Sequence, residues 1–208
     1  MSTQLTKHLL FKAALVLTAL VPLASYGGIT GTAHDLSARA WNTSGQICIV
    51  CHTPHNAQAT QLIPLWNHAA TATSFTLYSS NTLQAVPGQP AGISKACLSC
   101  HDGTVALDSF GNATGTNFMT PGTHVIGAGA KLNDDHPISF TYDAALATLD
   151  GGLVSPPNAN FVDATLKVPL FAGKMECASC HDVHSNANAP FLRKSNAGSA
   201  LCLTCHIK

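Results

Sequence analysis

The pattern of hydrophobic and polar positions changes once along the chain, near residue 27. Residues 13–24 form an apolar stretch of 12 residues that follows the positive side chains of Lys7 and Lys12 and precedes small residues. A transmembrane helix needs about 20 apolar residues, so this stretch is too short to span a bilayer. A charged start, a short apolar middle and a small-residue end are typical of an export signal. We therefore expect residues 1–27 to be a signal peptide.

After this segment, neither a helical nor a strand periodicity is sustained. Residues 109–135 are rich in glycine, asparagine and threonine, and we expect this segment to be a loop with one short strand. Turn-forming residues predict breaks at 83–92, 150–152 and 155–158. Short helices are expected at each cysteine motif described below, over 142–149 and over 196–206. The pattern thus predicts a mostly irregular fold with short α-helices and little strand.

Composition narrows the function classes. The 208 residues include 10 Lys+Arg and 10 Asp+Glu, giving a formal net charge of zero, and charged residues are 10% of the chain. An ordinary soluble domain has about a quarter. Without a basic stripe, no nucleic-acid partner is expected. Large apolar residues are scarce after residue 27, so we expect a core filled by a cofactor, an unfolded apo-protein, and no transmembrane segment in the mature chain.

The chemistry of the chain lies in its eight cysteines, all of which belong to a C-x-x-C-H motif. This motif is the attachment site of c-type haem. Two thiols one helical turn apart add to the two haem vinyl groups, and the following histidine binds the iron. The motifs are Cys48–His52, Cys97–His101, Cys177–His181 and Cys202–His206, with the thiols of Cys48, Cys51, Cys97, Cys100, Cys177, Cys180, Cys202 and Cys205.

Three other uses of paired cysteines are weaker. A disulfide between residues three apart closes a tight loop, and four such loops are improbable. Zinc does not require a histidine after every pair, and a redox C-x-x-C normally occurs once per domain. With 11 histidines in the chain, a histidine after all four pairs has a chance on the order of one in 10⁵. We therefore expect four covalently attached haem c groups.

Each iron takes a proximal histidine from its motif, and the sequence supplies enough others for the opposite face. The proximal ligands are His52, His101, His181 and His206. Methionine ligation, which would raise the reduction potential, is not favoured because Met175 lies too close to Cys177. The remaining histidines after residue 27 are His34, His55, His68, His124, His136 and His184. Bis-histidine ligation and low potentials are expected.

An internal repeat selects four of these six histidines. Each half of the chain carries H-x-(Leu/Ile)-Ser, then C-x-x-C-H-x-x-H, then a second C-x-x-C-H. The repeat predicts two dihaem units, approximately 28–115 and 116–208. It favours as distal ligands His34, His55, His136 and His184. His68 and His124 fall outside it and are runners-up, each also able to bind an iron of a neighbouring subunit.

The second histidine of H-x-x-H cannot bind the same iron as the first. Residues three apart share one helix face, about 5–6 Å from each other, and the first already faces its own haem. His55 and His184, if they are ligands, must therefore bind irons other than those of His52 and His181. Such cross-ligation would bring two haems close together. A surface or supporting role for these two histidines is the alternative.

Several segments resemble the doubled-CxxCH multihaem c-type cytochromes of metal-reducing bacteria. These segments are 34–37 (His-Asp-Leu-Ser), 48–56, 64–67 (Pro-Leu-Trp-Asn), 97–104 and 135–138. Over nearly the whole mature chain the sequence is similar to the OmcE-type tetrahaem subunit of extracellular cytochrome filaments. The resemblance implies a haem-cored, loop-rich subunit that polymerises into a wire, with every iron bis-histidine ligated and one ligand supplied by a neighbouring subunit. It also implies the four distal ligands that the repeat selects.

The leading hypothesis is an exported electron carrier rather than an enzyme. Its partners would be further copies of itself, redox partner cytochromes or extracellular acceptors, at the outer surface or in the periplasm. A soluble periplasmic shuttle is one alternative. A multihaem reductase of a small oxyanion is another, but it needs an iron with an open face, and distal histidines here are in surplus. A subunit of a membrane conduit is the third.

Overall fold

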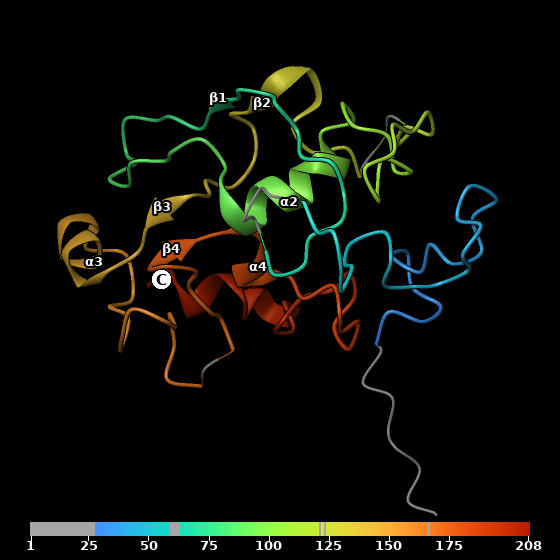
Figure 1. The fold of residues 1–208 in the computed structure, drawn as a ribbon. Coiled ribbons are helices and arrows are strands. Elements are labelled where there is room, and N and C mark those ends of the chain that lie inside the picture. The colour runs from blue at the N-terminus through green and yellow to red at the C-terminus, as the bar shows by residue number, and fades with distance from the viewer. Residues whose placement is uncertain (1–27, 59–62, 121, 123, 166) are drawn as a thin grey trace, which may run out of the picture.

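A computed structural model describes residues 28–58, 63–120, 122, 124–165 and 167–208. The expected signal peptide at 1–27 lies outside these residues. Most of the described chain consists of turns and irregular segments that wrap around a few short elements (Figure 1). The expected fold class, irregular with short helices and little strand, is confirmed. No helix in the described ranges is both long and apolar enough to cross a bilayer.

The helices follow the cysteine motifs, with one exception. The second motif ends α2 (Gly92–His101), the third forms α4 (Cys177–Cys180), and the fourth lies on the 3-10 helix η4 (Cys202–Thr204). The first motif is a hydrogen-bonded turn rather than a helix. The continuous helix expected over 196–206 is wrong: η3 (Ala197–Ser199) ends at Ser199, whose φ of +62° breaks the helical path before η4.

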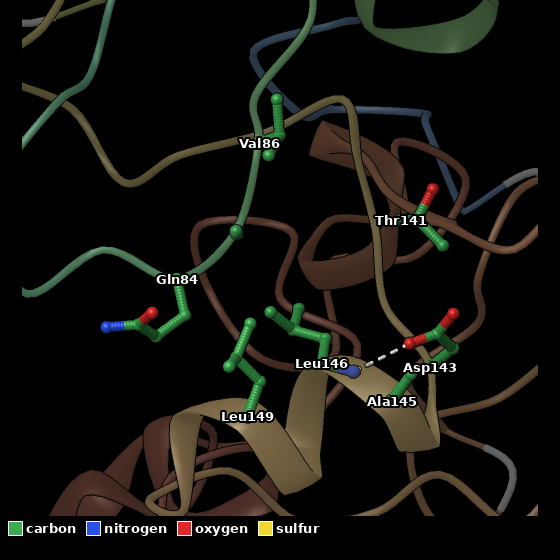
Figure 2. A pocket seen from close by; sticks show the side chains of 8 residues that line it. Gln84, Val86, Thr141, Asp143, Ala145, Leu146 and Leu149 are labelled. Carbon is green, nitrogen blue, oxygen red and sulfur yellow. Dashed lines mark hydrogen bonds between the residues drawn. The ribbon is translucent and has the colours of Figure 1, made fainter.

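The helix expected over 142–149 is confirmed as α3 (Ala144–Asp150). Asp143 caps its start by accepting a hydrogen bond from the Leu146 backbone N–H at 2.8 Å (Figure 2). Gly151 ends it with a φ of +71°, the left-handed conformation that glycine adopts without strain. The helix lines a cavity of about 340 Å³ opposite residues 84–86 (Figure 2).

In the part of the chain that the structure describes, the strands form two pairs of dipeptides, and isolated β-bridges add further backbone pairing. β1 (Thr76–Leu77) pairs in parallel with β2 (Lys131–Leu132), and β3 (Phe140–Thr141) pairs antiparallel with β4 (Lys174–Met175). β2 is the short strand expected within 109–135, and η2 (Ala128–Ala130) precedes it. These pairs join distant segments and hold the loops that carry the motifs.

Side chains form two small cores that the composition did not predict. Phe75, Leu98 and Leu132 join α2 to β2. A larger cluster of valine, leucine and aromatic side chains lies on the β3–β4 pair and α3; its members are Phe140, Tyr142, Leu146, Val162, Val168, Leu170 and Met175. Met175 is therefore committed to packing, in agreement with its exclusion as an iron ligand.

Helices α2 and α4 pack against each other near the centre of the molecule (Figure 1). Glu176, the residue before α4, is 6% exposed and accepts hydrogen bonds from Ser94 of α2 at 2.5 Å and from Ser139 at 2.8 Å. The second motif is thereby held against the third, across the expected boundary between the two units. The division into two dihaem units stays a prediction.

Candidate haem-binding sites

Each C-x-x-C-H motif contains one turn of helical spacing, although in the first motif this turn is not part of a helix. The backbone N–H of the histidine donates to the carbonyl of the first cysteine in the first, third and fourth motifs, at 2.8, 3.0 and 2.9 Å, and α2 contains the second motif. Because residues three apart share one helix face, each turn presents two thiols on one side. This is the arrangement that two thioether bonds to one haem require.

Burial affects the thiols of three motifs. It raises the pKa of Cys51 to about 11 and the pKa of Cys100 and Cys205 to about 12. The preference for haem over disulfide, zinc or thiol-redox use of the pairs comes from the histidine that follows every pair.

Three proximal histidines are fixed in one tautomer by the backbone. The Nδ1 atoms of His52, His101 and His181 lie 3.1, 2.7 and 3.2 Å from the carbonyl oxygens of Pro64, His124 and Pro190. A carbonyl only accepts, so Nδ1 must carry the proton, and Nε2 keeps its lone pair for a metal. This carbonyl-to-histidine contact is the usual support of a metal-binding histidine.

The fourth proximal histidine, His206, is held through its backbone. It forms a β-bridge with Leu153, and the adjacent Ile207 N–H donates to Gly152 at 2.8 Å. Similar bridges join His52 to Trp66 and His181 to a leucine, Leu192. Three of the four motifs are thus fastened by a β-bridge to a segment outside the motif.

Three proximal histidines face a second histidine ring. The ring centres of His52 and His184 are 6.3 Å apart, those of His136 and His206 are 6.4 Å apart, and those of His34 and His101 are 5.9 Å apart. Two imidazoles that bind one metal ion from opposite sides, with metal–nitrogen bonds of about 2.0–2.1 Å, have ring centres about 6 Å apart. These pairs therefore have the spacing of bis-histidine ligation.

Burial and neighbouring groups act on two of the distal histidines, His34 and His136. Burial lowers the pKa of His34 to about 4, so its ring is uncharged at neutral pH, as ligation requires. Phe191 packs edge-on against this ring, with centres 4.7 Å apart. His136 has its Nδ1 2.9 Å from the Pro137 carbonyl, and burial lowers its pKa as well.

The structure does not bring every candidate histidine to an iron site. His55 is exposed, and among the described histidine rings none is paired with it or with His181. His124 is exposed and contributes its carbonyl to His101. His68 is fully buried, and both its ring nitrogens contact carbonyl oxygens, at 2.8 and 3.0 Å. That arrangement leaves no free nitrogen on His68, so the structure does not favour it as a ligand.

Exposed apolar side chains gather beside the motifs, where a haem would cover them. Leu65 precedes Trp66, which bridges to His52, and Ile126 donates its N–H to the His101 carbonyl at 2.6 Å. Val183 lies between His181 and His184, while Leu203 and Ile207 lie within and just after the fourth motif; all five are 36–59% exposed. Burying such side chains against a porphyrin is favourable. The residues present therefore fit covalently bound haem c.

Consecutive motifs are neighbours in space. The thiols of Cys97 and Cys177 share a hydrogen bond, which raises the pKa of the first and lowers that of the second. Two further pairs of thiols lie close enough for their electrostatic interaction to raise a pKa, although burial is the larger cause. These contacts join the motifs in the order one, two, three, four through the pairs Cys51–Cys100, Cys97–Cys177 and Cys180–Cys205.

Sequence reasoning missed the residues that support the ligands. The carbonyls of Pro64 and Pro190 carry no side-chain signal, and Phe191 was not singled out. Asp182 directly follows the third motif, and its carboxylate lies 3.6 Å from the His184 Nδ1 and 3.1 Å from Arg193. An acidic residue directly after a proximal histidine was the available clue.

Comparison with known proteins agrees with this reading. Residues 169–208 match the family described as the doubled CXXCH motif. No curated protein of similar sequence was found. The matched segment contains the third and fourth motifs. The first and second motifs have the same C-x-x-C-H spacing of their cysteines and histidine, but they lie farther apart in the chain. The match and the geometry together support a multihaem c-type cytochrome of the electron-transfer class.

Proposed function

We propose that the protein is an exported tetrahaem c-type cytochrome that relays electrons through low-potential bis-histidine haems, as a polymerising subunit of an extracellular conducting filament. The observation that carries this proposal is the set of three histidine pairs at 5.9–6.4 Å. Each pair joins a proximal ligand to a histidine that the repeat selected independently. We infer a fourth haem at His181 from its motif.

Haem c supplies an iron that alternates between ferric and ferrous and so carries one electron. The chain's own residues set how this happens. The Pro64, His124 and Pro190 carbonyls hold Nε2 of three proximal rings ready for ligation. Two fixed nitrogen ligands leave no position for a substrate, which favours electron transfer over bond chemistry.

The order of the motifs supports a relay. Thiol contacts join each motif to the next, and α2 packs on α4 in the middle of the series. The first and last motifs each have an exposed cysteine, Cys48 and Cys202. We infer that electrons enter and leave at these two ends, from redox partner cytochromes, extracellular acceptors or the next subunit.

Polymerisation would explain the two histidines that remain without a ring partner. His181 and His55 are both exposed, and neither has a ring partner in the described part of the chain. A distal ligand supplied by the next copy makes a head-to-tail contact between two different surfaces, and such contacts generate open filaments. We propose His55 as that ligand, with His124 as the runner-up.

A second candidate function uses the same observation. If His181 keeps an open face on its iron, the protein could reduce a small oxyanion there. A soluble periplasmic shuttle with the same four haems is the remaining alternative. These functions differ in whether the open face persists in the assembled protein.

Electron microscopy of haem-positive material sheared from cells tests the proposal first. Filaments whose peptides map to this chain are expected, and a monomer confined to the periplasmic extract would contradict them. Carbon monoxide should then bind one haem in four in dispersed, reduced subunits and none in filaments. Binding to intact filaments would favour the reductase.

Matched variants separate the candidate ligands. His55→Ala should remain dispersed and bind carbon monoxide at one haem, whereas His124→Ala, an equally exposed histidine, should assemble normally. The reverse result would transfer the role to His124. Assembly of both variants without a carbon monoxide site would overturn ligation by a neighbouring copy.

A further inference from the structure

An aspartate directly follows the proximal histidine in two of the four motifs. Asp102 follows His101, and Asp182 follows His181. The two carboxylates have the same position relative to their histidine but different surroundings. The difference lies in burial and in the presence of a cation, which are the two properties that decide how strongly a charge acts on a nearby iron.

Asp102 is buried without a cationic partner. It is 3% exposed, and its carboxylate accepts hydrogen bonds from the Thr71 hydroxyl at 2.5 Å and from the Thr104 N–H and hydroxyl at 2.8 Å each. Within the described ranges no lysine, arginine or histidine nitrogen lies within 4 Å of it. These three donated hydrogen bonds take the place of water around the carboxylate.

Asp182 is more accessible and is neutralised. Its side chain is 29% exposed and forms an ion pair with the Arg193 guanidinium at 3.1 Å. Arg193 is itself fixed, because its Nε donates to the Ala178 carbonyl of α4 at 2.6 Å. The local net charge beside His181 is therefore near zero, whereas that beside His101 is negative.

We propose that the uncompensated Asp102 carboxylate makes the haem of the second motif a lower-potential site than the haem of the third, where Arg193 cancels Asp182. This inference rests on the proposed attachment of haem at both motifs. A buried negative charge stabilises the ferric state relative to the ferrous state, so it lowers the reduction potential. Electron transfer from the second haem to the third is then downhill.

Two histidines outside the second motif lie close to it. The His34 ring centre is 5.9 Å from that of His101, and the His68 Nε2 is 3.6 Å from the Cys100 sulfur. Beside the third motif, the His184 Nδ1 lies 3.6 Å from Asp182. Because these groups and the distal ligands also affect the potentials, each haem is compared with itself, in the wild type and in a variant measured at the same pH.

The test is a haem-resolved redox titration of the holoprotein at pH 9, with paramagnetic NMR of the haem methyl groups to identify each haem. Asp102→Asn keeps the shape of the side chain, and its amide can donate to the Thr71 oxygen. This variant should shift the second haem to a more positive potential. Arg193→Gln exposes the Asp182 charge and should shift the third haem to a more negative potential.

Asp108→Asn is the matched control for net charge. This carboxylate is partly exposed and is bonded to Asn117 within its own loop, so its loss should leave all four potentials in place. General damage to the fold would not shift two haems in opposite directions. Equal potentials for the second and third haems in the wild type, or no shift in Asp102→Asn, would overturn the inference.

Failure of the proposed function is distinguishable from failure of this inference. A pyridine haemochrome assay that gives fewer than four haems per chain, or the absence of four reversible one-electron steps, would contradict the tetrahaem relay itself. Four reversible one-electron steps whose potentials do not change in the Asp102 and Arg193 variants would agree with a tetrahaem relay. They would contradict only the proposed order of potentials between the second and third haems.

Discussion

Replacing Glu176 by alanine should destabilise the fold more than any single surface change. Glu176 is the only glutamate in the chain. Its buried carboxylate accepts hydrogen bonds from Ser94, Ser139 and the third amide of α4. Each donor left unpaired in a buried site costs about 1–3 kcal/mol, and Glu176→Ala removes the acceptor of three donors. We expect a loss of about 3–5 kcal/mol of unfolding free energy for Glu176→Ala.

Guanidinium denaturation of the holoprotein, followed by far-UV circular dichroism, measures this loss. Ser139→Ala is the matched control, because it removes one donor and leaves the carboxylate with the others; a loss of about 1 kcal/mol is expected. If Glu176→Ala lowered the unfolding free energy by less than the serine variant, the network would not hold α2 against α4.

The same carboxylate predicts a pH dependence. Burial raises the pKa of Glu176 above its ordinary value of 4.5. The folded chain therefore binds a proton that the unfolded chain has released, and the free energy of unfolding falls as pH rises through this window. The contribution of the Glu176 proton to the free energy of unfolding is complete below pH 4.5, and it is lost as the pH rises through the folded-state pKa of Glu176. Glu176→Gln should remove this part of the slope, and an unchanged slope would refute the assignment.

Three further variants test other parts of the structure. Tyr142→Phe removes a hydrogen bond to the Val154 carbonyl, 2.8 Å long, and should cost about 1 kcal/mol in guanidinium denaturation. Phe191→Ala removes the ring that packs on His34; about 3 kcal/mol should be lost, and carbon monoxide binding by the reduced protein should increase by one site. Gly127→Ala places a side chain at a φ of +80° and should lower the melting temperature by the equivalent of about 1 kcal/mol or more.

The sequence predicted the chemistry better than the architecture. The spacing of the motifs predicts His52, His101, His181 and His206 as proximal ligands, because covalent attachment and ligation impose a strict local pattern. The core around Tyr142 was not predicted, since its members come from short segments without periodicity. The break at Ser199 was also missed, because a positive φ at a serine has no reliable sequence signal.

The candidate distal ligands illustrate the same limit. The repeat selected His34, His136 and His184, each of which has a ring partner in the structure. It also selected His55, for which no partner was found among the described rings. A repeat can indicate that two positions are equivalent, but contacts within one chain or between copies depend on loop paths that local sequence does not encode.

The pairing of His52 with His184 has a consequence for how the protein is made. In the exported protein that we propose, the amino-terminal end crosses the membrane first, so the first motif would be available for haem attachment before residue 184 has crossed. Until then, the iron at His52 lacks the second ligand that the folded chain offers it. We expect that a chain truncated after residue 180 would receive its first haem but expose an open, oxygen-reactive iron. Completion of the carboxyl-terminal end would thus act as a maturation checkpoint for the amino-terminal end.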